Sequence, residues 1–150
     1  MPTAVEYLLH IEGLITETDT VDAPFESYNF SAVNNIGSQS TGAGAGKVTF
    51  NPFSITRKID KASPHLFMAC ITGRHIKKVT LELLPAVQKG TATPFLVVTL
   101  MDVFISNVSE AGNVHGGAVP LEEVGFNFRT FQMTVNGVTF GYDLELRKII

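Results

Sequence analysis

The sequence predicts a mainly β domain, in which two packed sheets form a barrel or sandwich with one short helix beside them. Three observations predict it. Apolar and polar residues alternate in several short segments, only one segment has helical spacing, and Asn136-Gly137 carries the strongest short signal for a β-hairpin. The 150 residues have the size of one ordinary domain, so we expect a single β-barrel domain over residues 1–150.

Composition and charge exclude several classes of protein. Hydrophobic residues make up 45% of the chain, which favours a folded core and excludes general disorder. Cys70 is the only cysteine, so an internal disulfide framework and a cysteine-rich zinc site are excluded. The net charge is −3 and Lys and Arg do not cluster, so no nucleic-acid partner is expected.

No apolar run approaches the ~20 residues of a membrane span, and residues 1–13 lack the pattern of a secretory signal peptide. We therefore expect no membrane insertion. The protein is expected to be made in the cytoplasm, with any later export through a route that needs no cleaved signal.

Alternating apolar residues predict the first strand. Tyr7, Leu9 and Ile11 share one face, and the strand ends at Gly13. The acidic, Thr-rich segment from Leu14 to Pro24 predicts a connection.

A long glycine-rich loop follows a second strand, predicted over Glu26 to Val33. Loops of this length in compact domains are usually functional or disordered. A phosphate-binding loop is excluded because Val48, not Ser or Thr, follows Lys47 and a strand follows the loop. The candidate contact residues of this loop are Asn34, Asn35, Gly37, Ser38, Gln39, Ser40, Thr41, Gly42, Gly44, Gly46 and Lys47.

One segment, about Pro64 to Thr72, predicts a helix. Ser63 is a good N-cap, Pro64 fits the first helical position, and Gly73 suits a left-handed C-terminal position. The pairs at i,i+4 spacing that predict its apolar stripe are Leu66 with Cys70 and Phe67 with Ile71.

The later strands differ in how much cover they need. Val79, Leu81 and Leu83 alternate with polar residues, whereas Phe95 to Ile105 is apolar on both faces. The second pattern implies that the helix, a second sheet or another subunit covers the outer face. Apolar parity also changes at Pro52, which predicts a bulge or a bend there.

The C-terminal hairpin fixes its own register. Around Asn136-Gly137, the expected pairs are Val135 with Val138, Met133 with Phe140, and Phe131 with Tyr142. Upstream the parity flips, and one extra residue near Arg129 or Thr130 would continue the apolar face. We therefore predict a bulge there, with Phe128 opposite Leu144 and Phe126 opposite Leu146.

No group of residues predicts catalysis, a cofactor or a metal. His10, His65, His75 and His115 are scattered without metal-ligand spacing, and Cys70 lies on an apolar stripe that offers no cationic niche for a thiolate. Nothing selects a carboxylate pair. We therefore expect no catalytic, cofactor-binding or metal-binding residues, and a structural or binding role rather than an enzyme.

Three linked motifs resemble one family. They are Gly42-Ala43-Gly44-Ala45-Gly46-Lys47-Val48-Thr49-Phe50, then Asp60-Lys61-Ala62-Ser63-Pro64, then Ala69-Cys70-Ile71-Thr72-Gly73-Arg74-His75-Ile76. They resemble the haemolysin-coregulated protein family, Hcp, whose opening is also matched by Tyr7, Leu8, Ile11 and Gly13. The chain departs from the family at Tyr28 to Ala32, where the family often has a tryptophan and this chain has none.

The resemblance implies a tube subunit of a type VI secretion system. Such subunits form hexameric rings that stack into a hollow tube, which is expelled with a spike when a sheath contracts and which carries small effector proteins in its lumen. Implied partners are therefore copies of the chain itself, spike and sheath proteins, and small effectors; the implied location is the bacterial cytoplasm during assembly and then the extracellular space or a target cell.

Two alternatives remain open. A tail-tube protein of a phage or contractile particle would share the fold and the assembly. A carbohydrate-binding β-sandwich belongs to a different class and should present an exposed aromatic platform, which the absence of tryptophan disfavours.

The predicted role of Cys70 as a small core residue has a measurable consequence. Replacing it by Ala (Cys70→Ala) should lower the free energy of unfolding by about 1 kcal/mol, because a small cavity remains, while self-assembly survives. Urea unfolding and solution mass of the variant check this. A loss of function at an unchanged melting temperature would instead show that the thiol has a chemical role.

Overall fold

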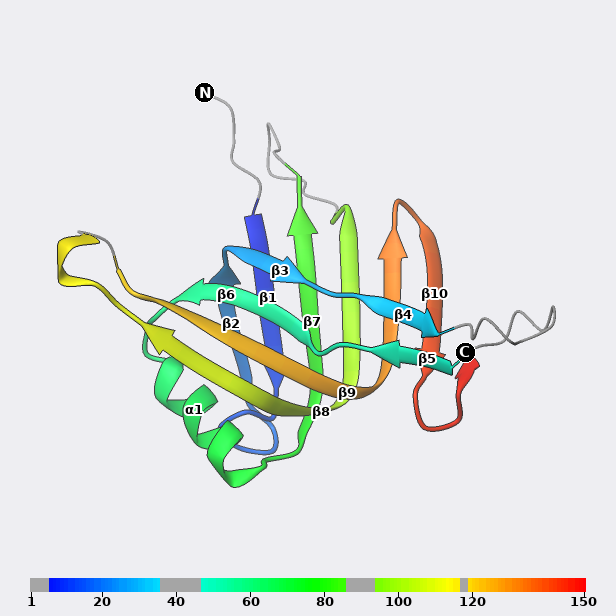
Figure 1. Ribbon diagram of the computed structural model, residues 1–150, viewed down its shortest axis with the longest axis horizontal. Helices are drawn as coiled ribbons and strands as arrows, with labels where there is room; N and C mark the ends of the chain where they lie inside the picture. Colours follow the sequence, from blue (N-terminus) through cyan, green and yellow to red (C-terminus); the bar gives the residue numbers. More distant parts are fainter. Residues whose placement is uncertain (1–5, 36–46, 86–93, 117–118) are drawn as a thin grey trace.

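The computed structural model describes residues 6–35, 47–85, 94–116 and 119–150. Within these ranges the chain is mostly β-strand with one α-helix, which confirms the predicted fold class (Figure 1). In chain order the elements are β1 (Glu6–Glu12), β2 (Thr20–Phe25), β3 (Ser27–Asn29), β4 (Ala32–Asn35), β5 (Lys47–Phe50), β6 (Phe53–Lys58), α1 (Ser63–Thr72), β7 (Ile76–Leu84), β8 (Leu96–Ala111), a 3-10 turn (Val114–Gly116), β9 (Leu121–Val135), β10 (Val138–Asp143) and β11 (Lys148–Ile149).

One branched sheet supplies both layers. Its main order is β11-β10-β9-β8-β7-β1-β2, and β9 also pairs with β6, which pairs with β3. In Figure 1, β3 and β6 cross in front of β1 and β7, so the two predicted layers lie face to face. The described strands do not form a closed barrel, because β2 and β3 do not pair with each other. Only Glu26 separates these two strands along the chain, and its N–H donates to the Thr56 carbonyl at 2.7 Å.

The two longest strands, β8 and β9, change their buried face at the same level. In β9 the buried side chains pass from Phe128 to Phe131, and in β8 they pass from Leu100 to Val103. Between the last two lies Asp102, whose φ of 54° is in the left-handed region. Because both strands change their buried face at the same place, the register between them is the same before and after this change.

The prediction of a bulge near Arg129 and Thr130, with β10 continuing beside Phe126, is wrong. The β9–β10 register runs without a shift from Val135↔Val138 to Thr130↔Asp143. Upstream, β9 leaves β10 and pairs with β6, so Phe126 lies opposite Phe53 rather than Leu146. The register shift of this ladder lies in β8 instead, between Ile105 and Asn107.

The hairpin itself is confirmed. All three predicted pairs are present. Asn136 and Gly137 have φ of 50° and 85°, the two positive values that a type I′ turn requires.

The helix prediction is confirmed except at its N-cap. Ala62, not Ser63, is the N-cap residue, and no side chain caps it. Ser63 is buried, and its Oγ accepts hydrogen bonds from the Asp60 N–H at 3.0 Å and from Arg57 Nη1 at 3.4 Å. Gly73 ends the helix with φ 67° as predicted.

Two further expectations need correction or refinement. Thr20 to Pro24 is not a connection: it forms most of β2, paired with β1 through Val21↔Ile11 and Ala23↔Leu9. Pro52 does mark a break, because β5 pairs with β4 before it and β6 pairs with β3 and β9 after it.

A network of aromatic rings fills the space between the layers. Phe30, between β3 and β4, contacts Phe53, Phe128 and Phe131, with ring centroids 5.1, 5.6 and 5.3 Å apart. Such tilted and edge-to-face pairs contribute stability beyond their burial. The rings joined in this way are Tyr7, Phe25, Tyr28, Phe30, Phe50, Phe53, Phe128, Phe131, Phe140 and Tyr142.

A buried ion pair joins β6 to β9 and to the start of α1. The Arg57 guanidinium, 1% exposed, contacts the fully buried carboxylate of Glu122 and lies 2.7 Å from Asp60 Oδ1. Because Arg57 also reaches Ser63 in the first turn of α1, this one side chain ties the helix to both strands.

Breaking this pair should be costly. Glu122→Ala leaves Arg57 buried without its main partner, so it should lower the free energy of unfolding by about 3–5 kcal/mol. The double variant Arg57→Met, Glu122→Leu should recover most of that loss, since it removes both charges. Urea unfolding at one protein concentration measures both effects. The matched control is Glu123→Ala, an exposed neighbour, and an equal loss in that variant would contradict the assignment.

Candidate self-association surfaces

The described residues hold no helix long and apolar enough to cross a membrane. In the same ranges, no three side chains of His, Cys, Asp or Glu come together as a metal site would require. The features that stand out are surfaces whose apolar side chains or strand edges lack a partner.

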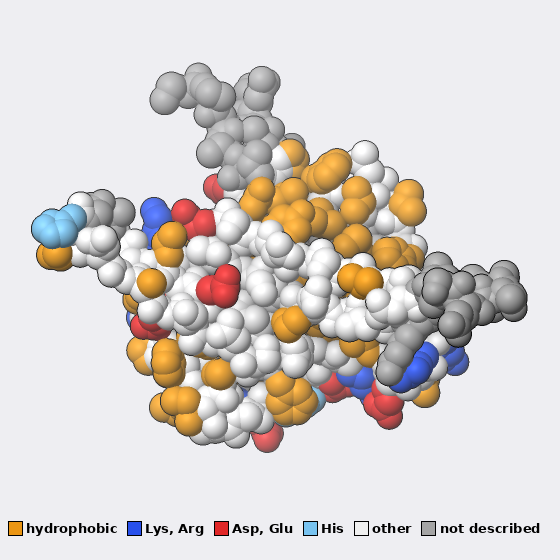
Figure 2. Space-filling model, in the orientation of Figure 1, with side chains coloured by type: hydrophobic (Ala, Val, Ile, Leu, Met, Phe, Trp, Pro, Cys, Tyr) orange, Lys and Arg blue, Asp and Glu red, His pale blue; other side chains and the backbone are white. Residues whose placement is uncertain are grey.

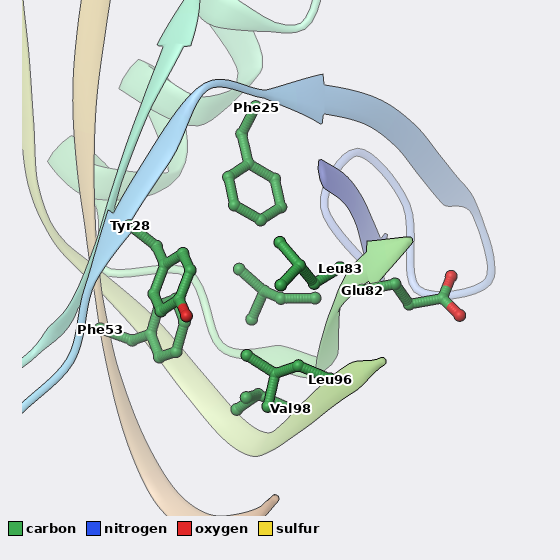
Figure 3. A pocket seen from close by; sticks show the side chains of 8 residues that line it. Phe25, Tyr28, Phe53, Glu82, Leu83, Leu96 and Val98 are labelled. Carbon is green, nitrogen blue, oxygen red and sulfur yellow. The ribbon is translucent and has the colours of Figure 1, made fainter. Parts of the chain in front are cut away.

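The first surface is the open mouth between the two layers. Phe25, Tyr28 and Phe53 face Leu83, Leu96 and Val98 around a small hollow, while the Glu82 carboxylate points away from it (Figure 3). Tyr28 stacks on Phe53 at 5.7 Å and is 40% exposed. Figure 2 shows hydrophobic side chains gathered at this end of the molecule, over the ends of β7 to β10. Exposed apolar patches of this kind commonly mark protein interfaces.

The second surface lies on α1. Leu66 and Ala69 are buried, but Phe67, Met68 and Ile71 are 40%, 61% and 73% exposed. Half of the predicted apolar stripe therefore faces outward, because the helix packs on the sheet along the side that carries Leu66 and Ala69. Burial against another molecule would remove this apolar area from water.

The third surface consists of two edges that have no strand neighbour within the described residues, although α1 also contacts β8. β7 pairs with β8 only as far as Val103, so the half of β8 from Phe104 to Ala111 has β9 as its only strand neighbour in the described chain. At the other end of the same layer, β3 pairs only with β6. Unpaired edges are templates for pairing with a further strand.

One face of β8 is covered within the chain, whereas the other, which the sequence also predicts to be covered, is partly exposed. Val98, Leu100, Val103 and Ile105 are buried. On the opposite face Met101 and Phe104 remain 42% and 44% exposed, and Phe95 at the strand's start remains 46% exposed. The expectation that both faces seek cover is therefore half met within one chain.

The contact loop predicted from the sequence lies largely outside the described residues. Gly37, Ser38, Gln39, Ser40, Thr41, Gly42, Gly44 and Gly46 fall there. Asn34 and Asn35 belong to β4 and lie opposite Val48 and Lys47 of β5. The loop is thus approached through a two-stranded sheet, and its contact role stays a prediction.

A charged cluster on the outer sheet face was missed by sequence reasoning. His10 of β1 lies between two carboxylates: Nδ1 is 2.6 Å from Asp22 Oδ1 on β2, and Nε2 is 2.6 Å from Glu82 Oε1 on β7. Both ring nitrogens must donate, which requires the protonated imidazolium. The alternation in β1 and β7 could have indicated part of this cluster, since His10 and Glu82 both occupy polar positions of alternating strands.

The pKa of His10 is raised. Partial burial alone would lower it, but the hydrogen bonds and negative charges of Asp22 and Glu82 together outweigh burial. The cluster therefore pins the edge strand β2 to β1 and β7.

Comparison with known proteins identifies the family. The family model described as "Type VI secretion system effector, Hcp" matches residues 16–135. The chain belongs to the Hcp family. The fold class and the resemblance predicted from the sequence are both confirmed, and Hcp is the family of type VI secretion tube proteins.

Individual Hcp relatives agree. Protein hcp1 of Pseudomonas aeruginosa is 36% identical over 88 residues, which cover 58% of this chain and 52% of that protein, so the chain spans about half the length of this curated relative. The crystal structure of Hcp1 from Salmonella typhimurium is 25% identical with a TM-score of 0.77, covering 98% of this chain and 99% of that one. A structure titled as a type six secretion system protein has a TM-score of 0.82 at 20% identity, covers 98% and 100% of the two chains, and shares the fold.

The His10 cluster makes stability depend on pH. Since the folded-state pKa of His10 is raised, its stabilisation is complete below about 6.5, the ordinary histidine value, and is lost as pH rises through the higher folded value. The free energy of unfolding should fall with pH across that window, and in His10→Gln this fall should be absent. Urea unfolding at a series of pH values measures it, with His115→Gln as the substitution remote from the cluster. An identical slope in wild type and His10→Gln would refute the assignment.

Proposed function

We propose that this chain is a structural subunit of a type VI secretion tube, and that it forms hexameric rings that stack into a hollow, effector-carrying tube. The chain acts as one Hcp-type domain and not as an enzyme. Its proposed partners are further copies of itself, spike and sheath proteins and small effector proteins. Assembly in the bacterial cytoplasm would precede export without a cleaved signal.

The observation that carries this proposal is a pair of edges on the layer β3-β6-β9-β8 that have no strand neighbour in the described chain, although α1 also contacts β8. One edge belongs to β8 between Phe104 and Ala111, and the other to β3. Two different edges at opposite ends of one layer favour head-to-tail contacts, which close into a ring when the rotation per subunit divides a full turn. A symmetric dimer would use the same edge twice and leave the other free.

The exposed apolar surfaces support the same proposal. Met68 and Ile71 on α1, and Phe95 near the mouth, carry apolar area that a lone protomer leaves in water. Neighbours in a ring or in the next ring would cover it. The two remaining alternatives are less supported, because the matching family model is that of the type VI secretion system.

The state of association tests the proposal. Light scattering after gel filtration should give six times the 16.3 kDa mass of the chain, and an equal mass is expected for Cys70→Ala. Removal of Gln39 to Ala43 should leave the circular dichroism unchanged, because loop length alters closure entropy only slowly. If the loop contacts the next ring, the shortened protein should form rings of normal mass that stack poorly.

Two outcomes would contradict parts of this account. A monomer at micromolar concentration would overturn the tube proposal itself. Normal tubes from the shortened protein would show that the loop is only a spacer, while the ring proposal would stand.

A further inference from the structure

Three charged side chains form a row across the strands β6, β9 and β8. Arg57 of β6 lies opposite Glu122 of β9, and Glu122 lies opposite Glu110 of β8. Residues directly opposite each other in an antiparallel sheet project from the same face, with Cβ atoms about 4.5–5.5 Å apart. The row therefore places two carboxyl groups side by side, with one guanidinium on the far side of Glu122.

The buried carboxylate of the row has one oxygen without a donor. Glu122 is 1% exposed, and its Oε2 contacts Arg57. Its Oε1 accepts no hydrogen bond from the residues that the structure describes. Because burial also removes this oxygen from water, leaving it without a donor costs free energy. The second side of the guanidinium is engaged elsewhere, since Arg57 Nη2 lies 2.7 Å from Asp60 Oδ1.

The charged neighbours of the row do not supply that donor. Lys58 and Glu123, the next residues along β6 and β9, are exposed and project from the opposite face of the sheet. On the side of α1, the charged neighbours are Asp60 and Lys61. Burial resists ionisation of Asp60, but hydrogen bonds from Arg57 and from a backbone N–H, with the charges of Arg57 and Lys61, lower its pKa. Asp60 therefore stays ionised and has no proton to donate.

The remaining donor is the carboxyl group of Glu110. Two ionised carboxylates repel each other and accept hydrogen bonds only, so a contact between Glu110 and Glu122 requires one proton. A hydrogen bond to Glu122 raises the pKa of Glu110, and desolvation and the negative charge of Glu122 raise it further. Among the described residues, Glu122 is the one charged group that shifts the pKa of Glu110.

We propose that Glu110 and Glu122 form a pH-sensitive latch at the end of β8. When Glu110 is protonated, its O–H donates to Glu122 Oε1 and fastens to β9 the part of β8 that has no β7 neighbour. When the proton leaves, the two like charges repel each other and the end of β8 loosens. The latch lies within one chain and does not depend on ring formation. It controls how firmly each protomer holds an edge that the proposed ring would use.

The direction of the pH effect follows from the raised pKa of Glu110. The folded chain binds this proton more tightly than the unfolded chain, in which the carboxyl has its ordinary pKa of 4.5. The latch therefore stabilises the folded state fully below that pH, and this stabilisation is lost as pH rises through the higher folded value. Glu110→Gln should remove the dependence, because an amide can donate to Glu122 Oε1 at every pH.

Two measurements on the full chain test the latch. In protein labelled with ¹³C at the glutamate carboxyl carbons, the signal that is absent from Glu110→Gln should titrate above pH 4.5, and a second carboxyl signal should shift in the same step. In urea unfolding at a series of pH values, the unfolding equilibrium constant of the wild type should rise with pH relative to that of Glu110→Gln. The rise should be about tenfold for each unit by which the pKa is raised.

A matched control removes other sources of pH dependence. Glu123→Gln makes the same change of charge on the opposite face of β9, and it should keep the wild-type titration and the wild-type slope. The His10 cluster is present in all three proteins, so its contribution cancels in the comparison.

Several results would overturn the latch. They are titration of Glu110 at the ordinary glutamate value, the same pH slope in the wild type and Glu110→Gln, or the same change of slope in Glu123→Gln. A changed solution mass of Glu110→Gln would also overturn it, because Glu110 would then contact a neighbouring subunit instead of Glu122. The ring proposal fails only on the mass of the wild-type protein, so the two failures are distinguishable.

Discussion

The pairing of β8 with β9 is the constraint on which the rest of the structure depends. These strands hold one register on each side of a bulge at Ser106, from Leu96↔Val135 to Ala111↔Leu121. Along that length each strand belongs first to one layer and then to the other. Both strands change their buried face at the same level, at Asp102 and Arg129, so the inner face stays apolar while the sheet bends.

This bend explains both the core and the free edges. From Thr130 to Val135, β9 pairs with β10, and from Leu121 to Phe126 it pairs with β6. Strand β8 has no pairing with β7 beyond Val103. The aromatic network fills the angle between the layers, and the Arg57–Glu122 pair joins β6 and β9 to the first turn of α1. A chain folded in this way satisfies its core but leaves the end of β8 and the outer side of β3 without strand neighbours. Self-association is the simplest use of such edges.

What the sequence predicted well was local. The register of the C-terminal hairpin follows from Asn136-Gly137, and the end of α1 follows from Gly73, because each depends on residues a few positions apart. The parity flip near Arg129 was located correctly, but its cause was not. Sequence alone could not tell that β6, far away in the chain, replaces β10 beside Phe126. Ser63 was misread for a similar reason, since Arg57 and Asp60 engage its hydroxyl instead of leaving it to cap the helix. The His10 cluster brings together three strands, so no local pattern contains it.

Hydrogen exchange along β8 tests most directly whether the free edges pair between copies. In the assembled protein, the amides of Phe104–Ala111 that point away from β9 and the amides of β3 that point away from β6 should be protected, and dilution to the monomer should release both sets together. Amides between Leu96 and Val103, already flanked by β7 and β9 within one chain, should keep their protection. Equal exchange of the Phe104–Ala111 amides in assembled and monomeric protein would contradict the account, because subunits would then associate through other surfaces.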